Sequence, residues 1–408
     1  MAAITDTDID LHAPLGAYLR LRERGPSFLL ESVERGRLGR HSFVGTGSRL
    51  LSFEEAEAEV ARGASVVGYL GYDHAARLEP VPLPVEGPGP PESLFVAAEA
   101  LVRFDHVLGR AEVLVGDAAE IGRALARPVP PSPRSPGLPG PIRRSPSADA
   151  YREAVRAAKE HIRAGDVLQI VLSQRAERPT SASAVALYRA LRRISPSPYL
   201  FLLELGDLAL VGASPETLVK LEGRKASANP IAGTTARGLG DAQRLLASAK
   251  DRAEHVMLVD LARNDLSRVC RPGSVVLERF LDVEPYSHVT HLVSEVVGEL
   301  EPSASGFDLL RACFPAGTVS GAPKVRAMQL ISELEGVRRG PYGGAVGYAL
   351  PDGSLDACIA IRMIVLVHGV ARLQAGAGIV AASDPDLEHR ECLQKLAAME
   401  QAIEEAER

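Results

Sequence analysis

The stretch FPAGTVSGAPKVRAMQLISELE, residues 314–335, joins a glycine-rich loop to an apolar repeat of helical spacing. A phosphate-binding loop would need G-x-x-x-x-G-K-[ST] directly after a strand. Here Gly317 and Gly321 are only four residues apart, Pro323 precedes the lysine, and Val325 stands where a magnesium-binding hydroxyl is needed. The sequence therefore argues against a nucleotide cradle and predicts a helix that starts at the proline.

The composition is that of an ordinary soluble protein. Of the 408 residues, 46% are hydrophobic and 24% are charged, and the length favours two lobes. The formal net charge of −6 argues against a nucleic-acid partner but is compatible with a small anionic substrate. No apolar run is long enough to span a bilayer, and MAAITDTDID lacks the features of a secretory signal. The four cysteines form no C-x-x-C pair, so we expect neither a zinc site nor a disulfide framework, and a cytoplasmic location.

A proline-rich segment, residues 126–147, divides the chain. Its prolines cannot sustain a helix or a central strand, so we expect a linker or a long surface loop. Before it, residues 1–125 contain short apolar runs that indicate a sheet-rich lobe. After it, residues 148–408 alternate helical patterns with short strands, and one helix is expected through residues 244–265. The pattern predicts an α/β or α+β fold with a large, mainly antiparallel sheet system.

Six long motifs give the chain a family resemblance. The opening stretch, PIAGTTARG, AEHVMLVDLARNDL, RGPYGGAVGY, IAIR and QAGAGIVAASDPDLEHRE resemble segments of the chorismate-utilising enzymes, from about Tyr151 to the C-terminus. The resemblance implies an α+β fold with two large, mainly antiparallel sheets packed together and flanked by helices, and residues 148–408 as the chorismate-binding catalytic domain. It also implies a need for Mg²⁺ and no nucleotide. The opening loop would then hold an organic acid against backbone N–H groups.

Two positions distinguish members of this family. Isochorismate and salicylate synthases, which add water, place a lysine base where this chain has Gln169; an amide cannot deprotonate water, so we expect ammonia as the nucleophile. Taken alone, Gln169 would be read as a hydrogen-bonded core amide. Aminodeoxychorismate synthases often carry a lysine where this chain has Ala232, which offers no amine for covalent catalysis. The resemblance thus implies amination of chorismate followed by loss of pyruvate, giving anthranilate.

Two alternatives stay open at this point. The first is the aminodeoxychorismate synthase component I of the folate branch, whose product retains the enolpyruvyl group. The second is a catalytically silent subunit that senses tryptophan. Retention of the family's catalytic positions argues against the silent subunit.

The resemblance assigns the acidic groups. Glu216 matches the general acid that protonates the allylic hydroxyl; without the resemblance it would be read as a turn carboxylate after a proline. Glu254, Glu388 and Glu391 match the glutamates that hold magnesium. Glu388 and Glu391 could otherwise complement the N-terminal end of a helix dipole.

The remaining catalytic and substrate-binding positions also come from the resemblance. Arg362 and Tyr342 match the pair that holds the pyruvyl carboxylate. His291 matches a histidine near the leaving pyruvate, and Lys324 is expected either near the site or in a salt bridge at a helix start. The backbone cradle for the substrate would be completed by Gly233, Thr234, Gly376 and Gly378.

The first lobe resembles an inhibitor-binding region. SFLLESVERGRLGRHSF, residues 27–43, is similar to the segment that binds tryptophan in anthranilate-forming members, and SPSPYLF, residues 195–201, to the opposite wall. The implied contacts of L-tryptophan are Glu31, Ser32, Pro198, Tyr199 and Cys358. Read alone, these are a surface turn and a strand edge.

Ammonia is expected to come from a partner. No stretch of the chain has a glutaminase's cysteine-centred glycine motif. The resemblance therefore implies a separate glutaminase subunit and a hetero-oligomer.

Overall fold

The computed structural model describes residues 13–22, 25–32, 40–85, 89–130, 140–236, 238, 240–285 and 289–408. The middle of the expected linker, residues 131–139, lies outside the described residues. Within the described ranges, none of the helices combines the length and the apolar character that a bilayer crossing requires.

The described part of the chain forms two large sheets in which neighbouring strands run antiparallel. The first sheet has eleven strands, with β8 beside β9. Its strands in spatial order are β17 (Gly321–Ala322), β9 (Gln169–Pro179), β21 (Val370–Ile379), β20 (Met363–Val367), β11 (Leu208–Ser214), β10 (Tyr199–Leu205), β1 (Ser27–Glu31), β2 (His41–Thr46), β6 (Ala100–Asp105) and β7 (Arg110–Val115), together with β8 (Arg143–Ser145).

The second sheet has ten strands in the same part of the chain, with β15 beside β16. Its strands in spatial order are β14 (Ile231–Ala236), β16 (Val289–Glu299), β13 (Lys225–Ala228), β12 (Thr217–Glu222), β19 (Leu355–Ile359), β18 (Ala345–Ala349), β4 (Val66–Leu70), β5 (Ser93–Ala97) and β3 (Leu50–Leu51), together with β15 (Val276–Pro285). The two sheets confirm the expected α+β fold.

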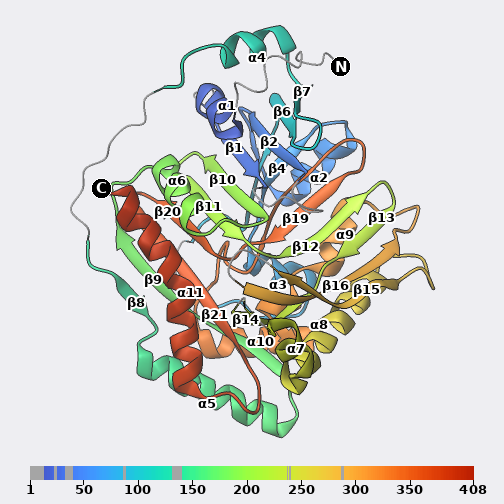
Figure 1. Cartoon of the computed structure of the whole chain (residues 1–408), viewed down its shortest axis with the longest axis vertical. Helices are drawn as coiled ribbons and strands as arrows, with labels where there is room; N and C mark the ends of the chain where they lie inside the picture. The colour runs from blue at the N-terminus through green and yellow to red at the C-terminus, as the bar shows by residue number, and fades with distance from the viewer. Residues whose placement is uncertain are drawn as a thin grey trace.

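Helices flank the sheets, and α11 lies along β21 and β9 (Figure 1). The described helices are α1 (Pro14–Leu21), α2 (Phe53–Ala61), α3 (Ala75–Leu78), α4 (Ala118–Leu125), α5 (Ala148–Ala164), α6 (Ala184–Ile194), α7 (Asp241–Ala247), α8 (Ala249–Ser267), α9 (Gly306–Cys313), α10 (Lys324–Glu335) and α11 (Pro385–Ala406), with short 3₁₀ turns η3 (Tyr72–His74) and η4 (Gly317–Val319).

Four apolar clusters hold the described sheets and helices together, one of which packs α5 and α10 against β9 and β21. The inner faces of the two sheets meet through side chains such as Phe28 and Phe201 from the first and Tyr69 and Val346 from the second. A second cluster joins the outer face of the first sheet to α1, α4, α6 and α11, and a third joins the outer face of the second sheet to α2, α8 and α9. Burial of these apolar surfaces is the main force that fixes the layers.

The ends of α10 agree with the sequence pattern, whereas the break between α7 and α8 was not expected. Pro323 is the N-cap of α10, and Gly336 ends it in the left-handed conformation with φ 63°. The single helix expected through residues 244–265 is wrong, because Ser248 breaks it into α7 and α8. Ser248 has an extended backbone, and its hydroxyl accepts a hydrogen bond from the N–H of Asp251. Serine stabilises a helix start in this way, so the second helix begins afresh.

Both sheets take strands from either side of the proline-rich segment. In the first sheet β1 pairs with β10, and in the second β4 pairs with β18. The proline-rich segment therefore does not separate one sheet from the other. The division into residues 1–125 and 148–408 stays a prediction about two segments of the sequence.

Candidate active site

Two of the connections by which the chain passes from one sheet to the other lie next to each other. One crossing joins β11 to β12 and carries Glu216; the other joins β19 to β20 and carries Arg362. Backbone hydrogen bonds tie the crossings together: the N–H of Ile359 donates to the carbonyl of Glu216 at 3.0 Å, and the N–H of Ala213 donates to the carbonyl of Arg362 at 3.0 Å. Strand connections thus bring together an acid and a cation that are far apart in the sequence.

The pKa of the Glu216 carboxyl group is high enough for it to keep its proton near neutral pH. Burial raises its pKa to about 7, against the opposing effects of the nearby Thr318 hydroxyl and the positive charge of Lys395. A carboxyl group with this pKa can donate a proton at physiological pH, which an ordinary glutamate cannot do efficiently.

Arg362 is held in a conformation that most residues avoid. Its φ is 53°, in the left-handed region, and such strain is often found at functional sites. Burial lowers the pKa of its guanidinium, while Tyr342 and Glu391 oppose that shift. No carboxylate in the described ranges lies within ion-pair distance of this guanidinium, so it is available to an anionic ligand.

Tyr342 lies beside Arg362 at the same junction. Its side chain is 5% exposed, and the neighbouring Gly343 N–H donates to the carbonyl of Ala360 at 2.8 Å. Burial raises the pKa of its phenol, so the hydroxyl remains a hydrogen-bond donor across the physiological range. The arginine and the tyrosine together can bind one carboxylate.

Gly376 and Gly378 on β21 are packed so closely against neighbouring atoms that neither position has room for a side chain. A Cβ atom on Gly376 would lie 2.9 Å from the carbonyl oxygen of Leu172 and 3.0 Å from the hydroxyl of Tyr342. A Cβ atom on Gly378 would lie 2.6 Å from the side-chain nitrogen of Gln169. The Gln169 side-chain oxygen is buried and finds no hydrogen-bond partner among the described residues, so it is not the satisfied core amide that the plain reading offered.

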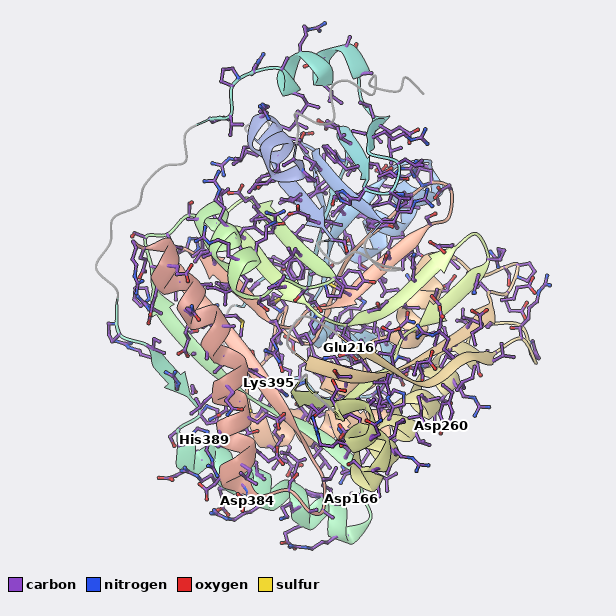
Figure 2. All side chains as sticks on the ribbon, in the orientation of Figure 1. Asp166, Glu216, Asp260, Asp384, His389 and Lys395 are labelled. Carbon is purple, nitrogen blue, oxygen red and sulfur yellow. The ribbon has the colours of Figure 1, made fainter. Side chains whose placement is uncertain are left out.

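Lys395 on α11 is a site residue that the sequence analysis missed. Its ammonium contacts a carboxylate oxygen of Glu391 at 2.7 Å and the carbonyl oxygen of Gly376 at 2.8 Å. Figure 2 shows it near Glu216 in the middle of the molecule, and its charge lowers the pKa of that carboxyl. The available signal was its spacing of four residues from Glu391, which places both on one face of a helix.

His291 on β16 lies beside the cradle loop. Its Nδ1–H donates to the carbonyl oxygen of Gly233 at 3.2 Å, and burial lowers the pKa of the imidazole. This hydrogen bond leaves Nε2 as the atom that can accept a proton. Thr234 is opposite His291 in the β14–β16 pairing, but its side chain lies outside the described residues.

The three glutamates assigned to magnesium come from two helices, Glu254 from α8 and Glu388 and Glu391 from α11. Among the described residues, no three histidine, cysteine or acidic side chains converge closely enough to hold a metal ion. Magnesium usually takes one or two protein carboxylates and completes its six oxygens with water and substrate. The carboxylate pair of α11 fits that pattern, since its members are one helical turn apart.

Two roles were expected for Lys324, a place near the site or a salt bridge at a helix start, and the structure shows the salt bridge. Its ammonium lies 2.8 Å from Asp265, and both side chains are largely buried. Asp265 and Glu216 line the same pocket, so this pair borders the site through its aspartate.

All five residues assigned to the inhibitor line one cavity between the sheets. The cavity has about 640 Å³ of empty space, including space open to solvent, and Glu31, Ser32, Pro198, Tyr199 and Cys358 are in its wall. The carboxylate of Glu31 already accepts hydrogen bonds from Tyr188 at 2.6 Å and Arg192 at 2.8 Å. Asp356, which was not predicted, also lines the cavity, and burial raises its pKa to about 6.

Comparison with known proteins gives consistent relatives. The family described as chorismate binding enzyme matches residues 32–401. The anthranilate synthase component 1 proteins of Thermus thermophilus and Streptomyces coelicolor are each 43% identical to this chain over 98% of its length, which corresponds to 96% and 88% of their own lengths.

Solved structures share the fold. Anthranilate synthase component I from Streptococcus pneumoniae superimposes with a TM-score of 0.80 at 32% identity, covering 98% of this chain and 99% of its own. The menaquinone-specific isochorismate synthase of Escherichia coli has a TM-score of 0.76 at 22% identity, covering 96% of this chain and 91% of its own, a likeness of fold alone.

Proposed function

The chain belongs to the chorismate-binding enzymes, and on this premise we propose that it carries the activity of anthranilate synthase component 1. The reaction is a lyase reaction of tryptophan biosynthesis: chorismate and ammonia give anthranilate, pyruvate and water. The full-length match to component 1 relatives supports this assignment within the family.

The observation that carries the proposal is the raised pKa of Glu216, about 7, at the junction of the two sheets. The allylic hydroxyl of chorismate leaves poorly unless it is protonated, and a partly buried carboxylic acid next to a positive charge supplies that proton. Lys395 stabilises the carboxylate that remains after the transfer.

The substrate has two carboxylates, and the site has separate groups for each. Arg362 and Tyr342 bind the pyruvyl carboxylate, while backbone N–H groups near Gly376 and Gly378 approach the ring because no side chain intervenes. Glu254, Glu388 and Glu391 are the residues that would hold Mg²⁺, with one or two of them as direct ligands beside the ring carboxylate. When bound, this ion supplies positive charge that offsets the charge of the substrate.

Ammonia attacks the ring carbon next to the carboxylate-bearing carbon. Gln169, in place of a lysine, cannot activate water, and Ala232 offers no amine for a covalent intermediate. After water has left, His291 receives or directs the ring proton through Nε2 as pyruvate departs, and aromatisation drives the step. A separate glutaminase supplies the ammonia, in keeping with the designation of the relatives as component 1.

L-Tryptophan occupies the cavity lined by Glu31, Ser32 and Tyr199 as a feedback inhibitor. The hydroxyl of Tyr199 contacts that of Thr217 at 2.8 Å, and Thr217 directly follows Glu216. Binding in the cavity can therefore shift the strand end that carries the general acid.

We place the protein in the cytoplasm. The four cysteines are buried free thiols, which suits a reducing compartment.

A direct assay tests the function. The purified chain is incubated with chorismate, Mg²⁺ and a high concentration of ammonium salt at mildly alkaline pH, with and without tryptophan. We expect blue anthranilate fluorescence and stoichiometric pyruvate, both suppressed by tryptophan. An aminodeoxychorismate product without pyruvate, identified by mass, would assign the chain to the other branch.

A further inference from the structure

Arg339 is a buried cation that lies between two tyrosine rings. Its side chain is 1% exposed, and its guanidinium carbon is 4.5 Å from the centre of the Tyr72 ring and 5.8 Å from that of the Tyr342 ring. A guanidinium within about 6 Å of an aromatic ring is attracted to the ring electrons. A cation this deep in a protein is costly unless every donor finds an acceptor.

Four of the five N–H groups of this guanidinium have an acceptor, and each of its three nitrogens donates at least once. It donates to the carbonyl oxygens of Val319 at 2.6 Å and Val171 at 2.7 Å. It also makes two bonds to the carboxylate of Glu335, at 2.9 and 2.6 Å. The fixed fork of an arginine suits such simultaneous contacts, whereas a lysine would satisfy fewer of them.

The backbone of this residue is fixed as well. The carboxylate of Asp73 accepts hydrogen bonds from the N–H of Arg339 at 3.2 Å and from that of Gly340 at 2.8 Å. Both ends of the residue are thus held, so the side chain has a single position from which to contact its neighbours.

Each neighbour leads to a group of the proposed site. Val319 directly follows Thr318, whose hydroxyl lies close to Glu216 and lowers the pKa of that carboxyl. Val171 is two residues from Gln169 on β9, and Tyr342 is the ligand for the pyruvyl carboxylate.

We propose that Arg339 is a positioning residue for the reaction, and that it fixes the ring of Tyr342 and polarises its hydroxyl toward the substrate carboxylate. This inference rests on the proposed function. The positive charge of Arg339 lowers the pKa of Tyr342 against the effect of burial, which makes the phenol a stronger donor. The ring of Tyr72 lies 4.5 Å from the guanidinium carbon, and its hydroxyl is buried without a hydrogen-bond partner among the described residues.

The test compares Arg339→Gln and Arg339→Lys with the parent enzyme in the ammonia-dependent assay. Because Tyr342 contacts the substrate in the ground state, we expect Arg339→Gln to raise the KM for chorismate about tenfold with a smaller change in kcat. Arg339→Lys, which keeps the charge, should recover part of the loss. In a Tyr342→Phe background, Arg339→Gln should change KM by less than about twofold, since the two act through one contact.

Arg178→Gln is the matched control. Arg178 is also a buried arginine, paired with Glu407 and with both side chains 4% exposed, at the far end of β9 from Gln169. Its loss should lower the melting temperature without changing KM. If Arg339→Gln behaved in the same way, or if its effect were undiminished in the Tyr342→Phe background, the positioning role would be wrong.

A second variant guards against the case in which Arg339→Gln does not fold. Arg339→Gln leaves Glu335 as a buried unpaired charge, so Arg339→Gln with Glu335→Gln is prepared in parallel. The same KM increase is expected in this neutral pair, and an unchanged KM would overturn the proposal. A parent chain that makes no anthranilate would refute the proposed function itself, which is a separate outcome.

Discussion

At the scale of single residues, the site contains a carboxyl group whose environment favours catalysis over stability. The folded-state pKa of Glu216, about 7, is above the ordinary value of 4.5 because burial disfavours the charged form. The stabilising contribution of this group is complete below the unfolded pKa and is lost as the pH rises through about 7. Above that pH the folded protein holds a poorly solvated carboxylate.

Replacement of Glu216 by Gln should therefore remove activity and add stability. At pH 8 we expect Glu216→Gln to raise the free energy of unfolding by about 2 to 3 kcal/mol, and at pH 4 by much less. Urea denaturation at the two pH values measures this difference. In the parent enzyme, kcat/KM for chorismate should fall as the pH rises above about 7, once the ammonia concentration is corrected for its own titration. A stability gain that does not depend on pH would contradict the assigned pKa.

The two glycines of β21 should respond differently to the same substitution. In Gly376→Ala the new methyl group meets the carbonyl oxygen of Leu172 at 2.9 Å, which is backbone and cannot move away. In Gly378→Ala it meets the end of the Gln169 side chain, which can rotate. We expect Gly376→Ala to raise the KM for chorismate at least about tenfold and Gly378→Ala to raise it less. Steady-state kinetics of the two variants test this order, and equal effects would contradict it.

Motif positions could be assigned from the sequence because each is adjacent to residues that identify the family. Glu216 and Arg362 prove to lie on neighbouring crossings, which no local pattern reveals. Lys395 and Arg339 were missed because an isolated cation has the same local pattern whether it is exposed or buried in a site. The role of Lys395 follows from its contact with Gly376 on another element. The role of Arg339 follows from its contacts with Tyr342 in the same loop and with Val171 and Tyr72 from distant parts of the chain.

At the scale of elements, the crossing from β11 to β12 links the proposed inhibitor cavity to Glu216, the proposed general acid. Tyr199 begins β10 in the first sheet, and its hydroxyl contacts Thr217, the first residue of β12 in the second sheet. The same hydroxyl donates to Asp356 at 3.1 Å. A ligand that displaces Tyr199 would pull on the residue next to Glu216.

Thr217→Val should weaken this coupling without emptying the cavity. Valine keeps the shape of threonine but cannot bond to Tyr199, so tryptophan should still bind while its effect on activity declines. We expect the concentration of tryptophan for half-inhibition to rise about five- to tenfold, with tryptophan affinity measured by calorimetry changing less than about threefold. Parallel losses of binding and inhibition would assign the contact to binding alone.

Element boundaries were predictable where one residue decides them. The proline before α10 has few alternatives as a helix start, so the predicted start of this helix is confirmed to within one residue. The break at Ser248 was harder to predict, because serine is tolerated inside a helix and can also start one. The apolar pattern of residues 244–265 does not show which of these two roles the serine has.

At the scale of the whole molecule, the two sheets are shared by both halves of the chain. Strands β1 and β2 extend the first sheet beyond β10, and β4 and β5 extend the second beyond β18. Removal of the first half would expose the edges of β10 and β18 together with the apolar faces of Phe201, Leu203 and Val346. Exposed edges of this kind promote aggregation.

A split at the proline-rich segment tests this dependence. Residues 1–130 and 140–408, expressed separately, should each be poorly soluble, because each lacks half of the inner core. Expressed together, they should assemble into one particle with the anthranilate activity of the intact chain, since every strand pairing can form without the covalent link. Co-purification on a tag attached to one fragment, followed by the fluorescence assay, measures both results. If the second fragment alone folded and turned over chorismate, residues 148–408 would be an autonomous catalytic domain, and the first lobe would serve the inhibitor cavity alone.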